Sequence, residues 1–277
     1  MIQLKTDLYT KIQDAKNFLN EQIKTAPEIA IILGTGLGDL AKRLGSSSAS
    51  VPYESIPHFP ASTVESHSGQ LVFGKIGDKS VAVMEGRFHY YEGYSLDQVT
   101  FPVRVLKELG ARLLIVSNAA GGLNLKYKRG ELVLIEDQIN CMGANPLIGP
   151  NDERLGIRFP DMCAPYSKRL IELASKVAKE KKIPIQKGVY VGVSGPNLET
   201  RAEYRMFRQF ADVIGMSTVP EVIVGVHAGL EILGISVVTD LCDPDHLEPV
   251  DIQAIIKVAN EAGPKVIQLV EALIKKL

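Results

Sequence analysis

The segment from Glu85 to Tyr94, EGRFHYYEGY, carries groups that could bind an anion. Arg87 is a cation, and His89, two residues later, is an imidazole. The segment follows Val81–Met84, an apolar run typical of a buried strand. Ligands of open α/β sheets usually bind at such strand ends. The alternative is a rim loop with core aromatics and a solvated arginine, and this segment alone does not decide between the two.

Two further segments of small residues follow apolar runs. Ile29–Leu33 leads into Gly34-Thr35-Gly36-Leu37-Gly38, and Leu113–Val116 leads into Ser117-Asn118-Ala119-Ala120-Gly121-Gly122. Backbone N–H groups free of side-chain bulk suit a phosphate. The first segment has neither the glycine spacing of a dinucleotide fingerprint nor the Lys-Ser/Thr pair of a P-loop. Each segment alone could be a tight turn, but two of them on one sheet favour an anion site.

The polar residues near the ends of the apolar runs fall into two chemical groups. The groups that could surround a small oxyanion are Thr35, His67, Arg87, His89, Ser217 and the amides around Ala119. Glu199 and Asp240 have apolar neighbours and could bind the hydrogen-bonding edge of a heterocycle, with apolar walls from Tyr91, Tyr190 and Met216. The alternative role of Glu199 is to cap the helix that follows it. Phosphate attack on a nucleoside is one of several chemistries that this spacing allows, since neither a nucleophile elbow nor an HExxH motif is present.

Strands and helices must alternate to position these groups. Helical spacing or flanking signals predict helices over 7–25, 40–44, 103–109, 170–178, 201–210, 220–227 and 255–273. Apolar runs predict strands over 29–33, 71–76, 80–84, 113–116, 132–135, 189–193, 213–216 and 232–238. The alternation predicts an α/β fold, and the hairpin around Gly77 predicts a mixed sheet. We expect a single domain over residues 1–277, with loops at 45–50 and 141–165, the second long enough to be functional or an interface.

Composition excludes several classes of protein. The chain has 277 residues, 45% hydrophobic and 23% charged, with a net charge of −1, so it has no electrostatic footprint for nucleic acid or an acidic membrane. Its three cysteines contain no CxxC pair, which argues against a disulfide scaffold or a zinc site. We see no signal-peptide core and no apolar run long enough to span a bilayer, and therefore expect a soluble, cytoplasmic protein.

Six motifs of the chain resemble, in the same order, those of the trimeric purine nucleoside phosphorylases. They are His67-Ser68-Gly69, the segment 85–94, Asn118-Ala119-Ala120-Gly121-Gly122, the segment 149–154, Gly195-Pro196-Asn197-Leu198-Glu199-Thr200 and Gly215-Met216-Ser217-Thr218-Val219-Pro220-Glu221. The resemblance runs from about Ile29 to the final helix. It implies one α/β domain with a mixed, partly barrel-like sheet, assembled as a homotrimer. It also implies reversible phosphorolysis of purine nucleosides to free purine and α-ribose 1-phosphate, with phosphate as co-substrate and without metal or organic cofactor.

The resemblance also implies a role for each matching residue. The residues implied for phosphate are Thr35, His67, Arg87, His89, Ala119 and Ser217; for ribose, Tyr91 and Met216; for the purine, Glu199 and Asp240 with Tyr190 and Leu198 beside them. His89, Glu199 and Asp240 would take part directly in catalysis. Phe159 would be lent to the site of a neighbouring subunit. Thr35 stands where the family usually has Ser and keeps the hydroxyl, whereas Leu198 replaces an aromatic residue and removes a stacking face.

Two departures from the family pattern concern the choice of nucleoside. Asp240 stands where members restricted to inosine and guanosine usually have Asn. A protonated Asp240 could donate to N7 and accept from a 6-amino group, so we hypothesise that adenosine-type nucleosides are accepted. Ile252 aligns with the histidine that contacts the 5′-hydroxyl, and an apolar contact suits a 5′-methylthio group.

Methylthioadenosine phosphorylase is therefore the alternative activity, although those enzymes lack the pattern of segment 85–94. A nucleoside-binding protein without catalysis is a remote alternative, because it would not need Arg87, His89 and Ser217 together.

Overall fold

The computed structural model describes residues 7–34, 39–44, 49–61 and 69–277. Strands and helices alternate along most of this chain. The strands are β1 (Ile29–Ile32), β2 (Ala49–Pro52), β3 (Gln70–Ile76), β4 (Lys79–Glu85), β5 (Leu113–Gly122), β6 (Leu132–Cys141), β7 (Ile185–Val193), β8 (Val213–Gly215) and β9 (Glu231–Leu241). The helices are α1 (Leu8–Gln22), α2 (Asp39–Lys42), α3 (Leu96–Glu108), α4 (Lys168–Lys181), α5 (Arg201–Phe207), α6 (Val219–His227) and α7 (Ile252–Ile274), with 3₁₀ turns η1 (Tyr53–Ser55) and η2 (Tyr90–Glu92).

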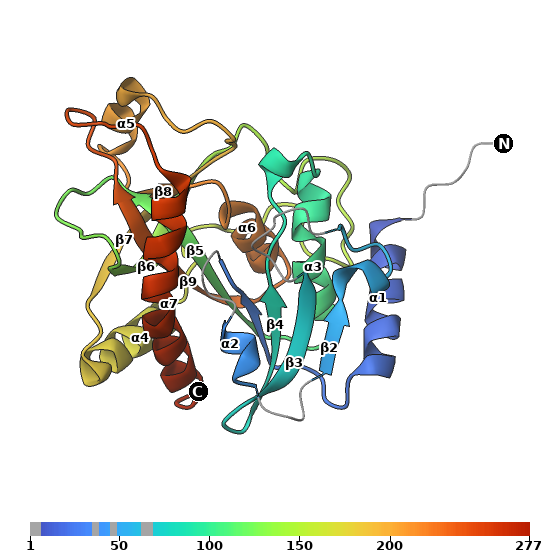
Figure 1. The fold of residues 1–277 in the computed structure, drawn as a ribbon. Helices are drawn as coiled ribbons and strands as arrows, with labels where there is room; N and C mark the ends of the chain where they lie inside the picture. Colours follow the sequence, from blue (N-terminus) through green and yellow to red (C-terminus); the bar gives the residue numbers. More distant parts are fainter. Residues whose placement is uncertain (1–6, 35–38, 45–48, 62–68) are drawn as a thin grey trace.

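The nine strands of the described chain form one mixed sheet in the order β2-β3-β4-β1-β5-β8-β7-β6-β9. Because β9 also pairs with β5, the strands β5, β8, β7, β6 and β9 close into a ring, while β1, β4, β3 and β2 extend from it as an open wing. Figure 1 shows the wing on the side of α1 and the ring on the side of α4 and α7. The predicted α/β fold with a mixed, partly barrel-like sheet is therefore confirmed.

The parallel strands at the centre of this sheet are apolar along their length because both of their faces are covered. Every residue of β1 is buried, and β1 pairs in parallel with both β4 and β5. On the ring side, α7 packs on β9 and α4; on the wing side, α3 packs against α1 and α6. The carboxyl ends of β1, β4, β5 and β9 consequently meet at one edge of the sheet, where the residues predicted to bind ligands follow them.

The structure differs from the predicted elements at several places; among them, β6 and β7 are longer than the strands expected over 132–135 and 189–193. The helix expected over 103–109, with Pro102 in its first turn, begins at Leu96, because Ser95 and Gln98 form a reciprocal cap. Pro102 therefore lies inside the helix. Residues 117–122, expected as a loop, are the second half of β5, where small residues allow close pairing with β9 and β8. Residues 49 and 50, expected in a loop, begin β2, which pairs with β3.

Candidate active site

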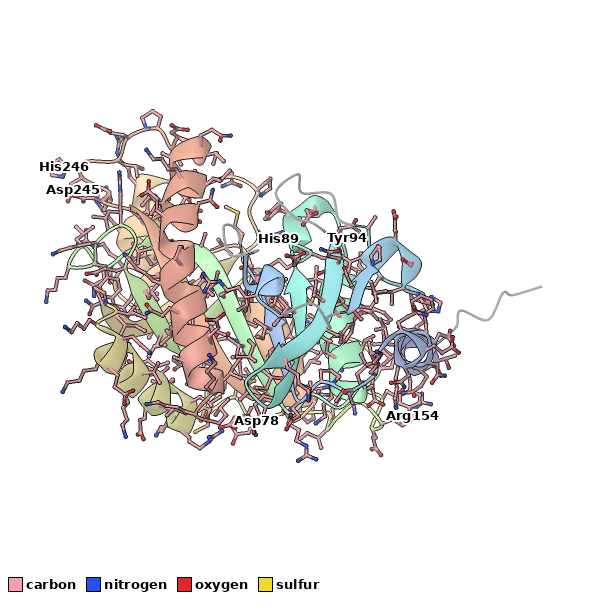
Figure 2. All side chains as sticks on the ribbon, turned by 60° about the horizontal axis from the view of Figure 1, so that its bottom comes forward. Asp78, His89, Tyr94, Arg154, Asp245 and His246 are labelled. Atoms are coloured by element: carbon pink, nitrogen blue, oxygen red, sulfur yellow. The ribbon has the colours of Figure 1, made fainter. Side chains whose placement is uncertain are left out.

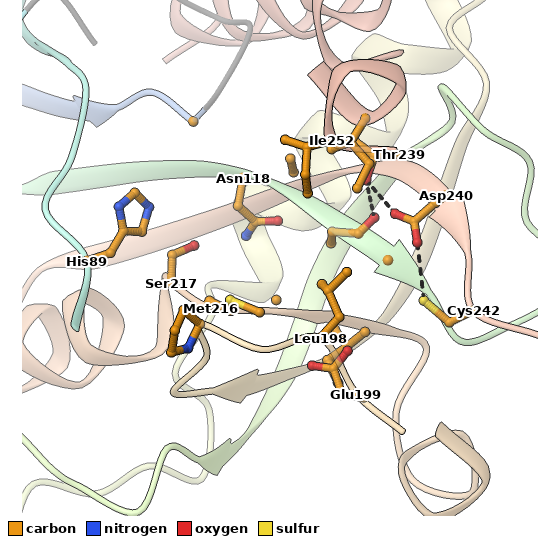
Figure 3. Close-up of a pocket in the computed structure, with 18 of the residues that line it drawn as sticks. His89, Asn118, Leu198, Glu199, Met216, Ser217, Thr239, Asp240, Cys242 and Ile252 are labelled. Carbon is orange, nitrogen blue, oxygen red and sulfur yellow. Dashed lines mark hydrogen bonds between the residues drawn. The ribbon is translucent and has the colours of Figure 1, made fainter. Parts of the chain in front are cut away.

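A cavity of about 330 Å³ lies at the carboxyl ends of the central strands. Gly34 follows β1, Arg87 and His89 follow β4, and Asp240 lies near the end of β9. The other lining residues are Tyr91, Asn118, Ala119, Ala120, Gly121, Pro196, Leu198, Glu199, Tyr204, Ile214, Gly215, Met216, Ser217, Thr239, Cys242, Ile252 and Ile255. Figure 3 shows His89 and Ser217 at one end of this cavity and Asp240, Cys242 and Glu199 toward the other.

Arg87 is the cation at the end of the cavity where His89 and Ser217 lie, and only 3% of its surface is exposed. Its Nη1 donates to Thr218 Oγ1 at 3.1 Å and forms an ion pair with Glu221 Oε1 at 3.2 Å. Its Nη2 donates to the carbonyl oxygen of Ser117 on β5. Arg87 Nε is buried and has no hydrogen-bond partner within the described residues. A buried, oriented guanidinium of this kind is a strong site for an anion.

His89 is held in position by Glu92. Its Nδ1 lies 2.8 Å from Glu92 Oε1, which also accepts the backbone N–H of His89 at 2.8 Å. The ring stacks on that of Tyr91, with centroids 4.7 Å apart and planes 15° apart. The imidazole at the rim of the cavity is therefore fixed from two sides.

Ser217 and Asn118 complete the described part of this end. The backbone N–H of Ser217 donates to the hydroxyl of Tyr190 at 3.3 Å, and Asn118 Nδ2 donates to Thr218 Oγ1 at 2.8 Å. Thr218 has φ +68°, a conformation that costs energy for a branched residue and often occurs at functional sites. The predicted residues Thr35 and His67 lie outside the described residues. The cavity thus brings together Arg87, His89, Ala119 and Ser217 of the predicted phosphate set.

The second end carries two carboxyl groups, Glu199 and Asp240. Thr200, not Glu199, caps α5: its hydroxyl accepts from the Glu203 N–H, and the Glu203 carboxylate accepts from the Thr200 N–H. The alternative capping role of Glu199 is therefore filled by its neighbours. Asp240 accepts the hydroxyl of Thr239 at 2.8 Å and the thiol of Cys242 at 3.5 Å, as Figure 3 shows.

Burial sets the electrostatics of this end. It raises the pKa of Glu199, and the hydroxyl of Tyr204 opposes that rise. Burial, with the nearby Asp240 carboxylate, raises the pKa of the Cys242 thiol far above its usual value, so the thiol stays protonated. Tyr204 is 2% exposed, and its raised pKa keeps the hydroxyl protonated as well. These neutral groups are hydrogen-bond donors beside the two carboxyls.

The middle of the cavity is mostly apolar. Met216 packs over Gly195, where a Cβ would lie 2.4 Å from its Sδ and where φ is +63°, so a side chain at that position would displace Met216. Tyr91 and Ile252 line the cavity while 38% and 54% exposed. Leu198, from the same turn as Glu199, also lines the cavity.

Two of the predicted site residues lie elsewhere. Tyr190 is completely buried, and burial raises its pKa to about 12; it is not among the lining residues and instead supports Ser217 from below. Phe159 is 83% exposed on the loop between β6 and α4, beside a separate cavity of about 520 Å³.

The sequence reasoning did not name Tyr204 and Cys242. Cys242 lies two residues after Asp240, so the alternation of an extended chain could have indicated it. Tyr204 carried no signal, because its contact depends on how α5 is docked.

The described residues were also compared with what a metal site and a membrane-spanning helix require. Within them, no group of three or more His, Cys, Asp or Glu side chains could hold a metal ion. Across the same ranges, no helix combines the length and apolar character that a bilayer span requires.

Several known proteins similar to this chain are purine nucleoside phosphorylases. The model of the phosphorylase superfamily matches residues 28–275. Purine nucleoside phosphorylase 1 of Geobacillus stearothermophilus is 50% identical over 97% of this chain and 98% of its own. The crystal structures of Schistosoma mansoni purine nucleoside phosphorylase with adenosine and with inosine have TM-scores of 0.91 and 0.92. Each is 39% identical and covers 97% of this chain, and the alignment covers 97% and 96% of the two crystallised chains.

Proposed function

Because the chain belongs to the purine nucleoside phosphorylase family within the phosphorylase superfamily, we propose that it catalyses the reversible phosphorolysis of purine nucleosides. The products are a free purine and α-ribose 1-phosphate, or the deoxyribose equivalent. The observation that carries the proposal is the polarity of the cavity: a buried cation with histidine and serine at one end, two carboxyls at the other, and apolar residues between them.

The cationic end is the proposed phosphate site. Arg87 Nε, which is buried and unpartnered within the described chain, would donate to a phosphate oxygen, as would His89, the Ser217 hydroxyl and the amide at Ala119. We propose that Thr35 and His67 also belong to this site. A phosphate dianion held beside the sugar stabilises the positive charge that develops on the ribose as the base departs.

The carboxyl end is the proposed purine site. Glu199 and Asp240 would bind the polar edge of the base, with Leu198 beside its face and Tyr190 supporting the floor from below. The departing purine gains negative charge, which a donor at N7 would relieve. Phosphate is itself the nucleophile, so neither a covalent enzyme intermediate nor a cofactor is needed, and positioning supplies much of the rate.

Asp240 favours the acceptance of adenosine-type nucleosides. A carboxyl there accepts a hydrogen bond from a 6-amino group, whereas an ionised carboxyl opposes the O6 of inosine. The Schistosoma mansoni relative was crystallised with both adenosine and inosine, so the scaffold binds either kind of base in that protein. We propose that this chain accepts both and is shifted toward the 6-aminopurine.

A second candidate, methylthioadenosine phosphorylase activity, is favoured by one observation. Ile252 and Ile255, from the first turn of α7, line the cavity where a polar 5′ contact is expected. An apolar lining there suits a 5′-methylthio group better than a hydroxyl.

The assembly is also part of the proposal. Phe159 is exposed together with Ile148 and Ile157 on the loop between β6 and α4. We propose a homotrimer in which Phe159 reaches the nucleoside site of the neighbouring subunit.

The experiment is a substrate panel of inosine, guanosine, adenosine and methylthioadenosine, each with and without phosphate. Release of base that requires phosphate supports the proposal. The ratio of kcat/KM values separates the two candidate activities, and tight binding without turnover would exclude both.

A further inference from the structure

Thr218 is fully buried directly after Ser217, one of the proposed phosphate ligands. It occupies the N-cap position of α6, where a threonine hydroxyl ordinarily accepts a hydrogen bond from the first turn of the helix. Within the described chain this hydroxyl makes no such bond, and the backbone has φ +68°, which is unfavourable for a β-branched residue. Thr218 thus lacks both a helix cap and a relaxed backbone, which indicates another role for its hydroxyl.

The Thr218 hydroxyl has three polar neighbours instead. Its Oγ1 lies 3.1 Å from Arg87 Nη1, 2.8 Å from Asn118 Nδ2 and 3.2 Å from Ser217 Oγ. Arg87 follows β4, Asn118 lies on β5 and Ser217 follows β8, so three separate segments meet at this one oxygen. Arg87 and Asn118 are buried as well, so water does not compete for their hydrogen bonds to Thr218.

The chemistry of these neighbours sets the direction of each hydrogen bond. A guanidinium and an amide NH₂ group only donate, so Arg87 and Asn118 together fill both lone pairs of Thr218 Oγ1. The hydroxyl proton of Thr218 remains, and among the described residues Ser217 Oγ is the acceptor within reach. Thr218 therefore donates to Ser217.

Ser217 keeps its own proton for the cavity. Its side chain lies at the same end of the cavity as His89, as Figure 3 shows, and its oxygen already accepts from Thr218. The charged oxygens of phosphate accept hydrogen bonds, so they need serine as a donor. Three bonds then run in one direction, from Arg87 to Thr218, from Thr218 to Ser217, and from Ser217 to the phosphate.

We propose, on the basis of the function proposed above, that Thr218 is a positioning residue of the phosphate site. Its hydroxyl orients that of Ser217 as a donor to phosphate and connects it to the buried Arg87 cation. Hydrogen bonds that run in one direction polarise one another, so Ser217 donates more strongly than an isolated serine would. Thr218 acts through Ser217 and is not itself among the residues that line the cavity.

The test is a double-mutant cycle on the KM for phosphate, measured with saturating inosine. Thr218→Val keeps the shape of the side chain and removes the hydroxyl, so the phosphate KM should rise by about fivefold while the inosine KM stays the same. Ser217→Ala should raise the phosphate KM by about tenfold or more. In the Ser217→Ala background, Thr218→Val should add less than about twofold, because the group through which Thr218 acts is gone.

Thr218→Ser is the matched control, because it keeps the hydroxyl and removes only a methyl group. Its phosphate KM should equal that of the unmodified protein. An equal rise in Thr218→Ser and Thr218→Val would assign the effect to packing of the methyl group and overturn the proposal. An unchanged phosphate KM in Thr218→Val would overturn it as well.

A competing arrangement has the Asn118 amide turned, so that its oxygen takes the Thr218 proton and the hydroxyls of Thr218 and Ser217 act independently. It predicts that the effects of Ser217→Ala and Thr218→Val multiply in the double variant. That result would overturn the proposal.

Neutron diffraction of the unmodified, deuterium-exchanged protein tests the same point without a variant. This matters because Thr218→Val leaves the buried Arg87 and Asn118 donors without their acceptor and therefore lowers stability. We expect a deuteron on Thr218 Oγ1 directed at Ser217 Oγ, and a deuteron directed at Asn118 would contradict the proposal. If the unmodified protein shows no phosphate-dependent cleavage, the proposed function fails, whereas the neutron map of the phosphate-free protein still decides the direction of the bond between Thr218 and Ser217.

Discussion

Asp240 is the residue that bears most directly on the choice of nucleoside. It lines the carboxyl end of the cavity and accepts hydrogen bonds from Thr239 and Cys242. Asp240→Asn replaces an acceptor with an amide that can donate to O6. We expect the adenosine-to-inosine ratio of kcat/KM to fall by about tenfold or more, because an acceptor that favours the 6-amino group is replaced by a donor that favours O6.

The matched control is Asp78→Asn, in the exposed turn between β3 and β4, far from His89 in Figure 2. It makes the same chemical change away from the cavity and should leave the ratio unchanged. A ratio that is equal in the unmodified protein and in Asp240→Asn would contradict the specificity proposal.

Arg87 is the corresponding residue for phosphate. Its guanidinium contacts Thr218, Glu221 and the Ser117 carbonyl at once, which a lysine ammonium cannot reproduce. Arg87→Lys keeps the charge that neutralises Glu221, so the protein should still fold. We expect the KM for phosphate to rise by about tenfold or more, with a smaller change in the KM for the nucleoside. An unchanged phosphate KM would place the phosphate elsewhere.

At the scale of elements, we expect the N-terminal cap of α5 to position Glu199. Thr200 and Glu203 hold the first turn, and Glu199 immediately precedes it. Thr200→Ala removes the cap and should lower the free energy of unfolding by about 1 kcal/mol. We expect the nucleoside KM to rise and the phosphate KM to stay the same, because only the carboxyl end depends on this turn.

Thr200→Ser is the control because it keeps a capping hydroxyl. It should resemble the unmodified protein in denaturant unfolding and in both KM values. Equal effects of the two substitutions would show that the cap does not position Glu199.

The sequence was sufficient for elements with a strong local signal. The fully apolar run of β1 and the helical spacing of α1 and α4 predicted those elements well. Local signals misled where tertiary pairing decided the outcome. The small residues of 117–122 resemble a loop, yet they form the second half of β5. Small residues are required there because β9 and β8 approach closely: a Cβ at Gly121 would lie 2.5 Å from Cys242 Sγ.

The candidate site shows the same division. Arg87 and His89 follow β4, whose carboxyl end meets those of its parallel neighbours β1 and β5, whereas Ser217 follows β8, which is antiparallel to β5. The burial of Tyr190 under Ser217 and the approach of Tyr204 to Cys242 depend on how distant elements pack. No pattern along the chain encodes that packing locally.

At the scale of the whole molecule, the exposed apolar side chains of the loop between β6 and α4 are the surface that we propose as the subunit interface. Phe159 is 83% exposed, Ile148 78% and Ile157 67%. Large apolar side chains exposed together on one loop often mark an interaction surface. Sedimentation equilibrium should give three times the 30.2 kDa mass of the chain. Phe159→Ala should raise the nucleoside KM while leaving the phosphate KM unchanged. A fully active monomer would contradict both the trimer and the role of Phe159.

The most direct test of the central claim is the stoichiometry of the reaction itself. Adenosine or inosine is incubated with the protein and phosphate, and the free base and ribose 1-phosphate are quantified, the latter by phosphorus NMR. The proposed function predicts equal amounts of the two products, and no base when phosphate is omitted. Release of base without phosphate, or binding of nucleoside without release, would contradict it.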